Sequence, residues 1–233
     1  MRGRGAGAGW AMRDQRGYAI CDAVIERGET AQLLEAICGA GSARTRAGAR
    51  HLLNVPAVRT IAEDPRLRKL AAQFLGQEPV PFRATLFDKS SGSNWLVAWH
   101  QDTVLPVRQR SDDPAWGPWS TKAGVLCARA PAWALERVVA LRISLDDSTS
   151  TNGPLRVLPD THRRGVLSAA EIERLGEIIA PVDCTTSAGG AVVMRPLTVH
   201  ASSKSASDGP RRVLHIEYAT SLTLRSGIEL AVS

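Results

Sequence analysis

The sequence lacks paired cysteines and any long apolar run, which excludes several common classes of protein. Its four cysteines include no Cys-x-x-Cys pair, so neither a zinc ribbon nor a redox pair is expected. Scattered single cysteines are typical of reduced thiols in a reducing compartment. No stretch approaches the length of a membrane span, and no apolar segment of a signal peptide follows the basic start. We therefore expect a soluble, cytoplasmic protein without a membrane partner.

The chain also lacks a concentrated patch of one charge. Lysine and arginine total 29 against 23 for aspartate and glutamate, a formal net charge of +6. The arginines are dispersed, and the densest runs, Arg163-Arg164 and Arg211-Arg212, are only pairs. A nucleic-acid-binding protein would concentrate its positive charge, so no nucleic-acid partner is expected. A mild basic excess is equally compatible with an anionic small substrate.

The predicted elements begin with helices and continue with short strands. Helical periodicity covers 29–38 and 56–74, with a break expected at Asp64-Pro65 and an end at Gly76. The pattern also predicts a helix at 168–175 and strands at 17–21, 80–87, 95–100, 138–145, 155–158, 191–194, 198–202 and 212–219. This order is typical of a mainly β sandwich or jelly roll with an N-terminal helical cover. A length of 233 residues fits one such domain at 15–233, after a glycine-rich, flexible segment at 1–14.

Two segments lack periodicity and predict loops. The first is short and arginine-rich, at 44–50, and the second extends over 103–134. A loop as long as the second is usually functional, and we expect it to cover an active site as a lid. It contains Trp116, Trp119 and Trp133. These tryptophans face a substrate or form a small core of their own, and the sequence leaves both roles open.

A histidine and an aspartate at the end of a predicted strand form the first half of a candidate metal site. His100 and Asp102 follow the apolar run 95–99, and residues two apart on a strand share a face. His200 ends a second apolar run, 191–199. A His-x-Asp pair alone is short enough to occur by chance. Two imidazoles and one carboxylate together, with open coordination positions, are the facial triad of non-haem Fe(II) oxygenases.

Two polar residues after His200 are candidates for holding a co-substrate. Ser202 lies two residues further along, on the same face of the strand, and its hydroxyl can donate to a carboxylate. Arg211 begins the last predicted strand, and a guanidinium holds a carboxylate through two hydrogen bonds. A shift of one residue would exchange the two faces of that strand, so Arg212 is a second candidate.

Several segments together resemble the phytanoyl-CoA dioxygenase family. They are His100-Gln-Asp102, the segment from Asn152-Gly153 to His162-Arg163, the segment from Met194 to Ser202, and Arg211, in that order. The resemblance extends from Gly17 to Ala219. It implies a double-stranded β-helix, the cupin-like jelly roll, that uses Fe(II), 2-oxoglutarate and O2. Relatives usually have Pro-Gly-Ser-His where this chain has Pro159-Asp160-Thr161-His162, and aspartate tolerates the left-handed turn conformation that glycine adopts freely.

The same resemblance implies roles for individual residues. It implies that the triad of His100, Asp102 and His200 binds iron. Arg211 matches the arginine that pairs with the distal carboxylate of 2-oxoglutarate, and Ser202 matches its hydroxyl neighbour. A lid tryptophan approaches the cofactor in relatives, and we prefer Trp119 to Trp116 for that place. The other histidines are expected to be packing or pocket residues: His51, His162 and His215.

The function implied by the resemblance is the hydroxylation, or another oxidation, of an unactivated C–H bond in a small organic substrate, with release of succinate and CO2. Asp102 favours this reaction over halogenation, because halogenating relatives replace the carboxylate by a small residue and so free a position for chloride. Two alternatives stay open: a non-catalytic jelly-roll protein that binds a metal or ligand, and a nucleic-acid demethylase on the same fold. The sequence identifies neither the substrate nor the oligomeric state; acyl-CoA, amino acids and secondary metabolites are all possible.

Overall fold

A computed structural model of the chain describes residues 16–41, 44–45, 48–90 and 93–233, so the segment 1–14 lies outside the described residues. The strands are β1 Tyr18–Cys21, β2 Arg44–Thr45, β3 Gly48–Ala49, β4 Val80–Lys89, β5 Val97–His100, β6 Val104–Pro106, β7 Trp119–Lys122, β8 Val125–Arg129, β9 Val138–Ser144, β10 Leu155–Val157, β11 Val182–Cys184, β12 Ala191–Met194, β13 His200–Ser202 and β14 Arg211–Ala219. The helices are α1 Arg27–Gly39, α2 Pro56–Ala62, α3 Pro65–Leu75, α4 Ala132–Leu135 and α5 Ala169–Ile178, with 3-10 turns η2 Leu52–Asn54, η3 Thr161–Arg164 and η4 Arg225–Gly227.

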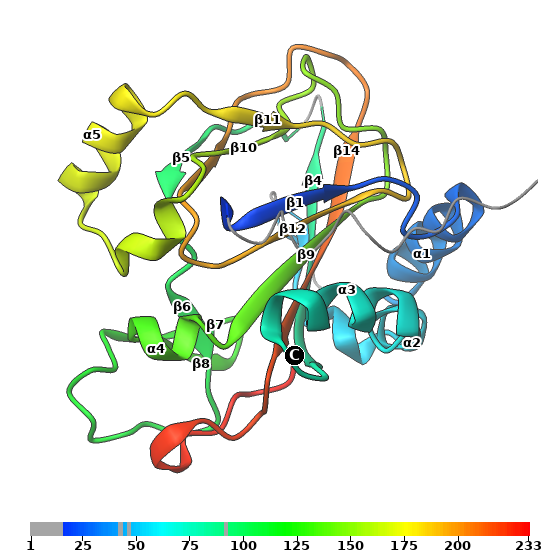
Figure 1. Cartoon of the computed structure of the whole chain (residues 1–233). Coiled ribbons are helices and arrows are strands. Elements are labelled where there is room, and N and C mark those ends of the chain that lie inside the picture. The colour runs from blue at the N-terminus through cyan, green and yellow to red at the C-terminus, as the bar shows by residue number, and fades with distance from the viewer. Residues whose placement is uncertain (1–15, 42–43, 46–47, 91–92) are drawn as a thin grey trace, which may run out of the picture.

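Two antiparallel sheets form the body of the molecule (Figure 1). The large sheet has the strand order β1-β12-β9-β14-β4-β3-β2, and the smaller sheet has the order β11-β10-β13-β5. Apolar side chains of both sheets pack between them, among them Val192 and Met194 from the large sheet and Leu155 and Val157 from the smaller one. Helices α1 to α3 cover the opposite face of the large sheet. The predicted mainly β jelly roll with an N-terminal helical cover is confirmed.

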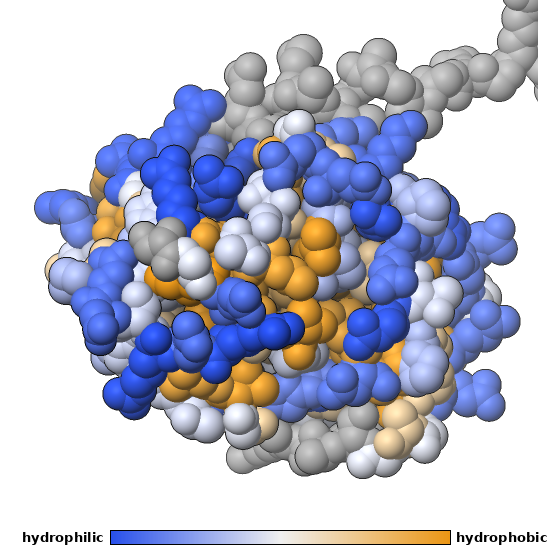
Figure 2. All heavy atoms as spheres, turned by 90° about the horizontal axis from the view of Figure 1, so that it is seen from below, coloured by the Kyte–Doolittle hydropathy of each residue, from blue (hydrophilic) through white to orange (hydrophobic). Residues whose placement is uncertain are grey.

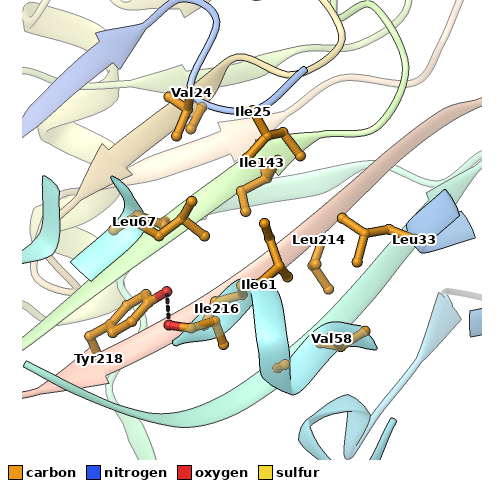
Figure 3. Close-up of a cluster of buried hydrophobic side chains, with 14 of the residues drawn as sticks. Val24, Ile25, Leu33, Val58, Ile61, Leu67, Ile143, Leu214, Ile216 and Tyr218 are labelled. Atoms are coloured by element: carbon orange, nitrogen blue, oxygen red, sulfur yellow. Dashed lines mark hydrogen bonds between the residues drawn. The ribbon is translucent and has the colours of Figure 1, made fainter. Parts of the chain in front are cut away.

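The face of the large sheet that carries the helices is apolar (Figure 3). Leu214, Ile216 and Tyr218 of β14 alternate toward this face and pack in one cluster with Val58 and Ile61 of α2. The hydroxyl of Tyr218 donates a hydrogen bond of 2.8 Å to the carbonyl of Ala62. Burial of each large aliphatic side chain stabilises the fold by about 1.5–3 kcal/mol. Because side chains alternate along a strand, the intervening residues of β14 point between the two sheets.

The helical segment expected at 56–74 divides where the sequence predicts a break. Asp64 caps α3, because its carboxylate accepts a hydrogen bond of 2.7 Å from the amide of Arg66, and Pro65 takes the first helical position. Gly76, with φ of 73°, ends the helix in the left-handed conformation. Asp64 and Pro65 therefore explain why two short helices lie here in place of one, and Gly76 explains where the second helix ends.

The prediction of an irregular loop at 103–134 is wrong. This segment contains α4 and an antiparallel sheet with the order β6-β8-β7, in which a turn at Ala123 and Gly124 joins β7 to β8. Trp116 is buried and meets the ring of Trp133 edge to face, with centroids 6.1 Å apart. These rings pack in a cluster that the segment shares with Phe82 of β4 and with the C-terminal segment, so they do not form a core of the segment's own. Prolines and short strands hide the alternation that marks a longer strand. For the same reason the prediction missed β11 and treated β2 and β3 as a loop.

The lower face of the molecule in Figure 1 is shown in Figure 2, where hydrophobic residues gather in the centre and hydrophilic residues surround them. The C-terminal segment closes against β4 at this end, since the amide of Ser233 donates to the carbonyl of Phe82 and its carbonyl accepts from Ala84. Val80 and Val232 are among the exposed apolar residues of the chain.

Within the described ranges, no helix combines the length and the apolar character needed to cross a membrane.

Candidate active site

A cavity of about 360 Å³ opens between the two sheets. Its floor is the inner face of the large sheet, where β4 and β14 present alternate residues in register: Lys89 opposite Arg211, Phe87 opposite Val213, Thr85 opposite His215, and Arg83 opposite Glu217. The smaller sheet supplies the other wall through β5 and β13. Polar and charged groups therefore converge on this cavity, while the other face of the large sheet holds the helices.

The structure brings the three predicted metal ligands together in this cavity. His100 ends β5 and His200 begins β13, and the two residues are directly paired in the smaller sheet. Their imidazole centroids lie 4.1 Å apart. The carboxylate of Asp102 places one oxygen 3.7 Å from Nε2 of His100 and the other 3.5 Å from Nε2 of His200. One ligand atom from each residue lies within 4.8 Å of the others, which suits a single ion.

Backbone carbonyls fix which nitrogen of each imidazole faces the cluster. Nδ1 of His100 lies 2.9 Å from the carbonyl of Ala98, and Nδ1 of His200 lies 2.9 Å from the carbonyl of Thr198. A carbonyl only accepts, so each Nδ1 carries the proton and each Nε2 keeps a lone pair for a metal. The donor set fits a divalent iron ion: two neutral imidazoles, one carboxylate and an open side.

Burial and charge set the protonation of these ligands. Burial lowers the pKa of His200 to about 4, which keeps its ring neutral at neutral pH. Burial opposes ionisation of Asp102, but the neighbouring His200, His215 and His100 hold its pKa well below the usual range. The side chain of His200 is 4% exposed, whereas His100 and Asp102 are 40% and 32% exposed. The metal-ligand cluster is therefore open to solvent on the side of His100 and Asp102.

Gln101, between two of the ligands, holds their segment in place. Its buried amide donates to the carbonyls of Gly165 and Leu197 at 2.9 and 2.8 Å, and its oxygen accepts from the amide of Leu167 at 2.9 Å. The amide of Asp102 donates to the carbonyl of Pro196 at 2.9 Å. These bonds tie the end of β5 to the segments before α5 and before β13.

We expect Gln101→Leu to lower the free energy of unfolding by about 2–4 kcal/mol, because it leaves buried backbone groups without partners. It should also weaken metal binding, since the ligand segment loses its support. Chemical denaturation and metal titration measure the two effects. Gln73→Leu, at an exposed position of α3, is the matched control and should change neither. Equal stability of the two variants would contradict a positioning role for Gln101.

One end of the cavity is cationic. Arg211 is buried, and its Nε has no hydrogen-bond partner among the described residues. Lys89, which the sequence analysis missed, is 1% exposed and donates to the hydroxyl of Ser202 at 2.9 Å and to the carbonyl of Ser203 at 2.5 Å. Nη2 of Arg211 lies 3.4 Å from the same hydroxyl. Burial lowers the pKa of Arg211 to about 10. A buried cation with an unused donor is an anion-binding arrangement.

The hydroxyl of Ser202 orients these cations, because its own proton is donated to the carbonyl of Gly153 at 2.9 Å. Gly153 has φ of 69°, and a Cβ there would collide with the carbonyl of Ser203. The predicted Asn-Gly turn is thus required for close approach of the two segments.

The neighbouring arginine faces away from the cavity. Arg212 forms two side-chain hydrogen bonds to the carboxylate of Asp146, at 2.8 and 2.7 Å, and its amide donates to the same group. Its guanidinium is therefore already neutralised. The geometry favours Arg211 over Arg212 as the partner of a bound carboxylate.

The remaining candidates lie outside the metal cluster. Trp119 is not among the cavity-lining residues; its ring lies beneath the guanidinium of Arg110, whereas Trp95 lines the cavity near Lys89. The other three histidines of the described residues do not belong to the metal-ligand cluster. His51 bonds to the carbonyl of Ala123, His162 lies in η3, and His215 faces the cavity beside Arg142. Asp160 adopts the left-handed conformation, with φ of 67°, as predicted for its turn.

Two histidines and an aspartate in the cavity of a double-stranded β-helix define the class of non-haem iron oxygenases. The model of the phytanoyl-CoA dioxygenase family matches residues 14–213. The chain therefore belongs to the phytanoyl-CoA dioxygenase family, and it is a dioxygenase that depends on non-haem iron and 2-oxoglutarate.

Solved structures share the fold. SnoN, a non-haem alpha-ketoglutarate-dependent epimerase of nogalamycin biosynthesis, is 21% identical with a TM-score of 0.68, over 90% of this chain and 79% of its own. EctD from S. alaskensis is 19% identical with a TM-score of 0.66, over 88% and 73%. AviO1 from Streptomyces viridochromogenes Tue57 is 23% identical with a TM-score of 0.64, over 90% and 93%. No protein of curated function matches the sequence.

Proposed function

We propose that the protein hydroxylates, or otherwise oxidises, an unactivated C–H bond of a small organic substrate and releases succinate and CO2. One observation carries the proposal: three ligand atoms from His100, Asp102 and His200 share a cavity with the cationic end formed by Arg211 and Lys89. The first cluster suits a divalent metal, and the second suits the far carboxylate of a dicarboxylic acid. The carboxylate of Asp102 favours hydroxylation over halogenation.

We assign Fe(II) to the triad and the distal carboxylate of 2-oxoglutarate to Arg211 and Lys89, with Ser202 orienting both cations. Bound iron and 2-oxoglutarate supply the oxidising power of O2 to the C–H bond. A related fold, that of SnoN, has been solved with Fe3+ and alpha-ketoglutarate. In this chain, the assignment of Fe(II) is supported by the two imidazoles and the carboxylate of the triad, and the assignment of 2-oxoglutarate by the unused Nε of Arg211.

The protein's own residues orient the reactants and exclude water. The Nδ1 bonds of both histidines fix the direction of the ligand lone pairs. The ring of Trp95 lies 5.4 Å from Nζ of Lys89, and Phe87 lines the cavity floor. The ring of Trp95 therefore lies against the cationic end, and exclusion of water strengthens each charged hydrogen bond formed there.

Binding of 2-oxoglutarate should weaken at high pH. Burial, followed by the charges of Arg211 and Arg142, lowers the pKa of Lys89 to about 8. The lysine therefore loses its charge above about pH 8, where an ordinary lysine would keep it. We expect the Kd of 2-oxoglutarate to be flat below about pH 7 and to rise above about pH 8, by at most about tenfold per pH unit.

Calorimetric titrations with the redox-inert Ni(II) protein measure this dependence. Lys89→Arg keeps the charge at every pH tested and should flatten the curve, while Lys89→Met should bind weakly throughout. A wild-type Kd that does not change up to about pH 9.5 would contradict the role of Lys89.

The reaction itself is tested by succinate release. Purified protein supplied with Fe(II), 2-oxoglutarate and O2 should form succinate slowly without any substrate, and a metal chelator or exclusion of O2 should stop it. Small molecules that accelerate succinate release are then examined by mass spectrometry for gain of one oxygen atom. A well-folded protein that forms no succinate above the protein-free background would count against the proposed reaction.

We also propose that the enzyme acts in the cytoplasm on a small molecule and not on nucleic acid. All four cysteines are free thiols, which suits a reducing compartment. Several cationic residues converge inside the cavity, where a small anion fits better than a polymer.

A further inference from the structure

Arg142 is a cation on the cavity floor that neither the triad nor the Arg211 end uses. It lies on β9 directly opposite His215 of β14. Its Nη1 lies 3.1 Å from Nδ1 of His215, and its guanidinium lies 5.1 Å from the ring centroid of Phe87. The guanidinium is thus held from two sides before any ligand binds.

No carboxylate neutralises Arg142 among the described residues. Two other arginines of this part of the sheet are paired with carboxylates, Arg83 with Glu217 and Arg212 with Asp146, whereas Arg211 is assigned to the co-substrate. The partner of Arg142 is a neutral ring instead: burial holds the pKa of His215 well below its usual value. Nδ1 of that ring accepts from the guanidinium, so the ring proton lies on Nε2. A buried cation without a counter-ion is costly, and burial accordingly lowers the pKa of Arg142.

The side chains that line the cavity carry a net positive charge that Fe(II) and 2-oxoglutarate together do not neutralise. Six cationic side chains line it, Arg50, Arg83, Lys89, Lys122, Arg142 and Arg211, against the two carboxylates of Asp102 and Glu217. Fe(II) adds two positive charges and 2-oxoglutarate removes two. An excess of four positive charges therefore faces whatever else enters. Arg50 and Lys122 are exposed, so they can attract an anion toward the cavity from solvent.

We propose that the substrate is an anion and that Arg142 binds its carboxylate or phosphate group beside the metal ligands. This inference rests on the proposed function of the same site and adds the class of substrate. Arg142 and the three residues of the triad line the same cavity, so an anion held by Arg142 lies in the space that the metal site faces. A guanidinium matches both oxyanions through two parallel hydrogen bonds.

The test compares ligands that differ only in charge. Protein loaded with Ni(II) and saturating 2-oxoglutarate, which occupies the Arg211 end, is exposed to phenylacetate or phenylacetamide, hexanoate or hexanamide, and phenyl phosphate or phenol. Thermal shift and calorimetry measure binding. We expect at least one anion to bind about tenfold or more tightly than its neutral analogue. Arg142→Gln should remove that preference, Arg142→Lys should keep part of it, and Arg212→Gln should leave it unchanged.

Two results would overturn the inference. One is equal binding of every anion and its neutral analogue by the wild-type protein, a comparison that needs no variant. The other is a loss of 2-oxoglutarate affinity in Arg142→Gln as large as that in Arg211→Met, because Arg142 would then belong to the co-substrate. The same pairs are measured with Ni(II) alone. If 2-oxoglutarate fails to bind the wild-type protein, the proposed function is wrong. The measurements with Ni(II) alone then still show whether the protein prefers each anion to its neutral analogue.

Discussion

Asp102→Ala is expected to abolish succinate formation and to lower the affinity for Fe(II) by more than about 100-fold, because even changes outside the ligand set commonly cost 10- to 100-fold. The substitution removes the single anionic donor and leaves two neutral imidazoles whose centroids are 4.1 Å apart. A divalent ion would then gain no charge compensation from the site. Anaerobic calorimetry with Fe(II) measures the affinity, and a coupled assay measures the succinate.

Asp208→Ala is the matched control, since it removes an exposed aspartate of the loop before β14. It should leave metal affinity and succinate formation unchanged. Asp102→Glu keeps a carboxylate but lengthens it, and should recover part of the metal affinity. Wild-type metal affinity in folded Asp102→Ala would contradict the assignment of the triad.

Arg211→Met should raise the Kd of 2-oxoglutarate by about 30-fold or more, while metal binding stays nearly intact. Removing one partner of a buried, hydrogen-bonded charge pair costs about 2–5 kcal/mol. Every 1.4 kcal/mol corresponds to a factor of ten in Kd, and the lower limit applies because Lys89 stays in place. Titration of 2-oxoglutarate into the metal-loaded protein measures the change.

Arg212→Met separates the two neighbouring arginines. Arg212 is bound to Asp146 on the other side of the strand, so its loss should affect stability slightly and 2-oxoglutarate affinity not at all. If Arg212→Met, in place of Arg211→Met, weakened 2-oxoglutarate binding, the two sides of β14 would have been assigned wrongly.

The parts of the fold that the sequence predicts are those with strong local signals. Alternation over 138–145, the Asp64-Pro65 break and the turn at Asn152-Gly153 all appear in the structure. Strands of two or three residues, such as β2 and β11, offer too few positions for a period to show. The β6-β8-β7 sheet was missed because its strands are short and its tryptophans and prolines obey no simple alternation.

The residues of the candidate site likewise include some that the sequence predicts and others that only the structure shows. His100, Asp102 and His200 are predictable because a metal needs particular residue types at short spacing, and the structure places them together. Lys89 and Arg142 were missed because each is a single cation within a strand, and only the pairing of β4, β14 and β9 shows what they face. The alternation of Arg83, Thr85, Phe87 and Lys89 was the available signal, since a buried strand rarely carries charges on one face. Trp119 was preferred for the cofactor from the resemblance alone, and among the described residues Trp95 lines the cavity while Trp119 does not.

The most direct test of the central claim is anaerobic reconstitution followed by visible spectroscopy. Addition of Fe(II) and then 2-oxoglutarate to the metal-free wild-type protein should produce a metal-to-ligand charge-transfer band that saturates at one equivalent of each per chain. The same additions to Asp102→Ala should produce no band, and Arg211→Met should require far more 2-oxoglutarate. Absence of the band in folded wild-type protein at saturating concentrations of both would contradict the account.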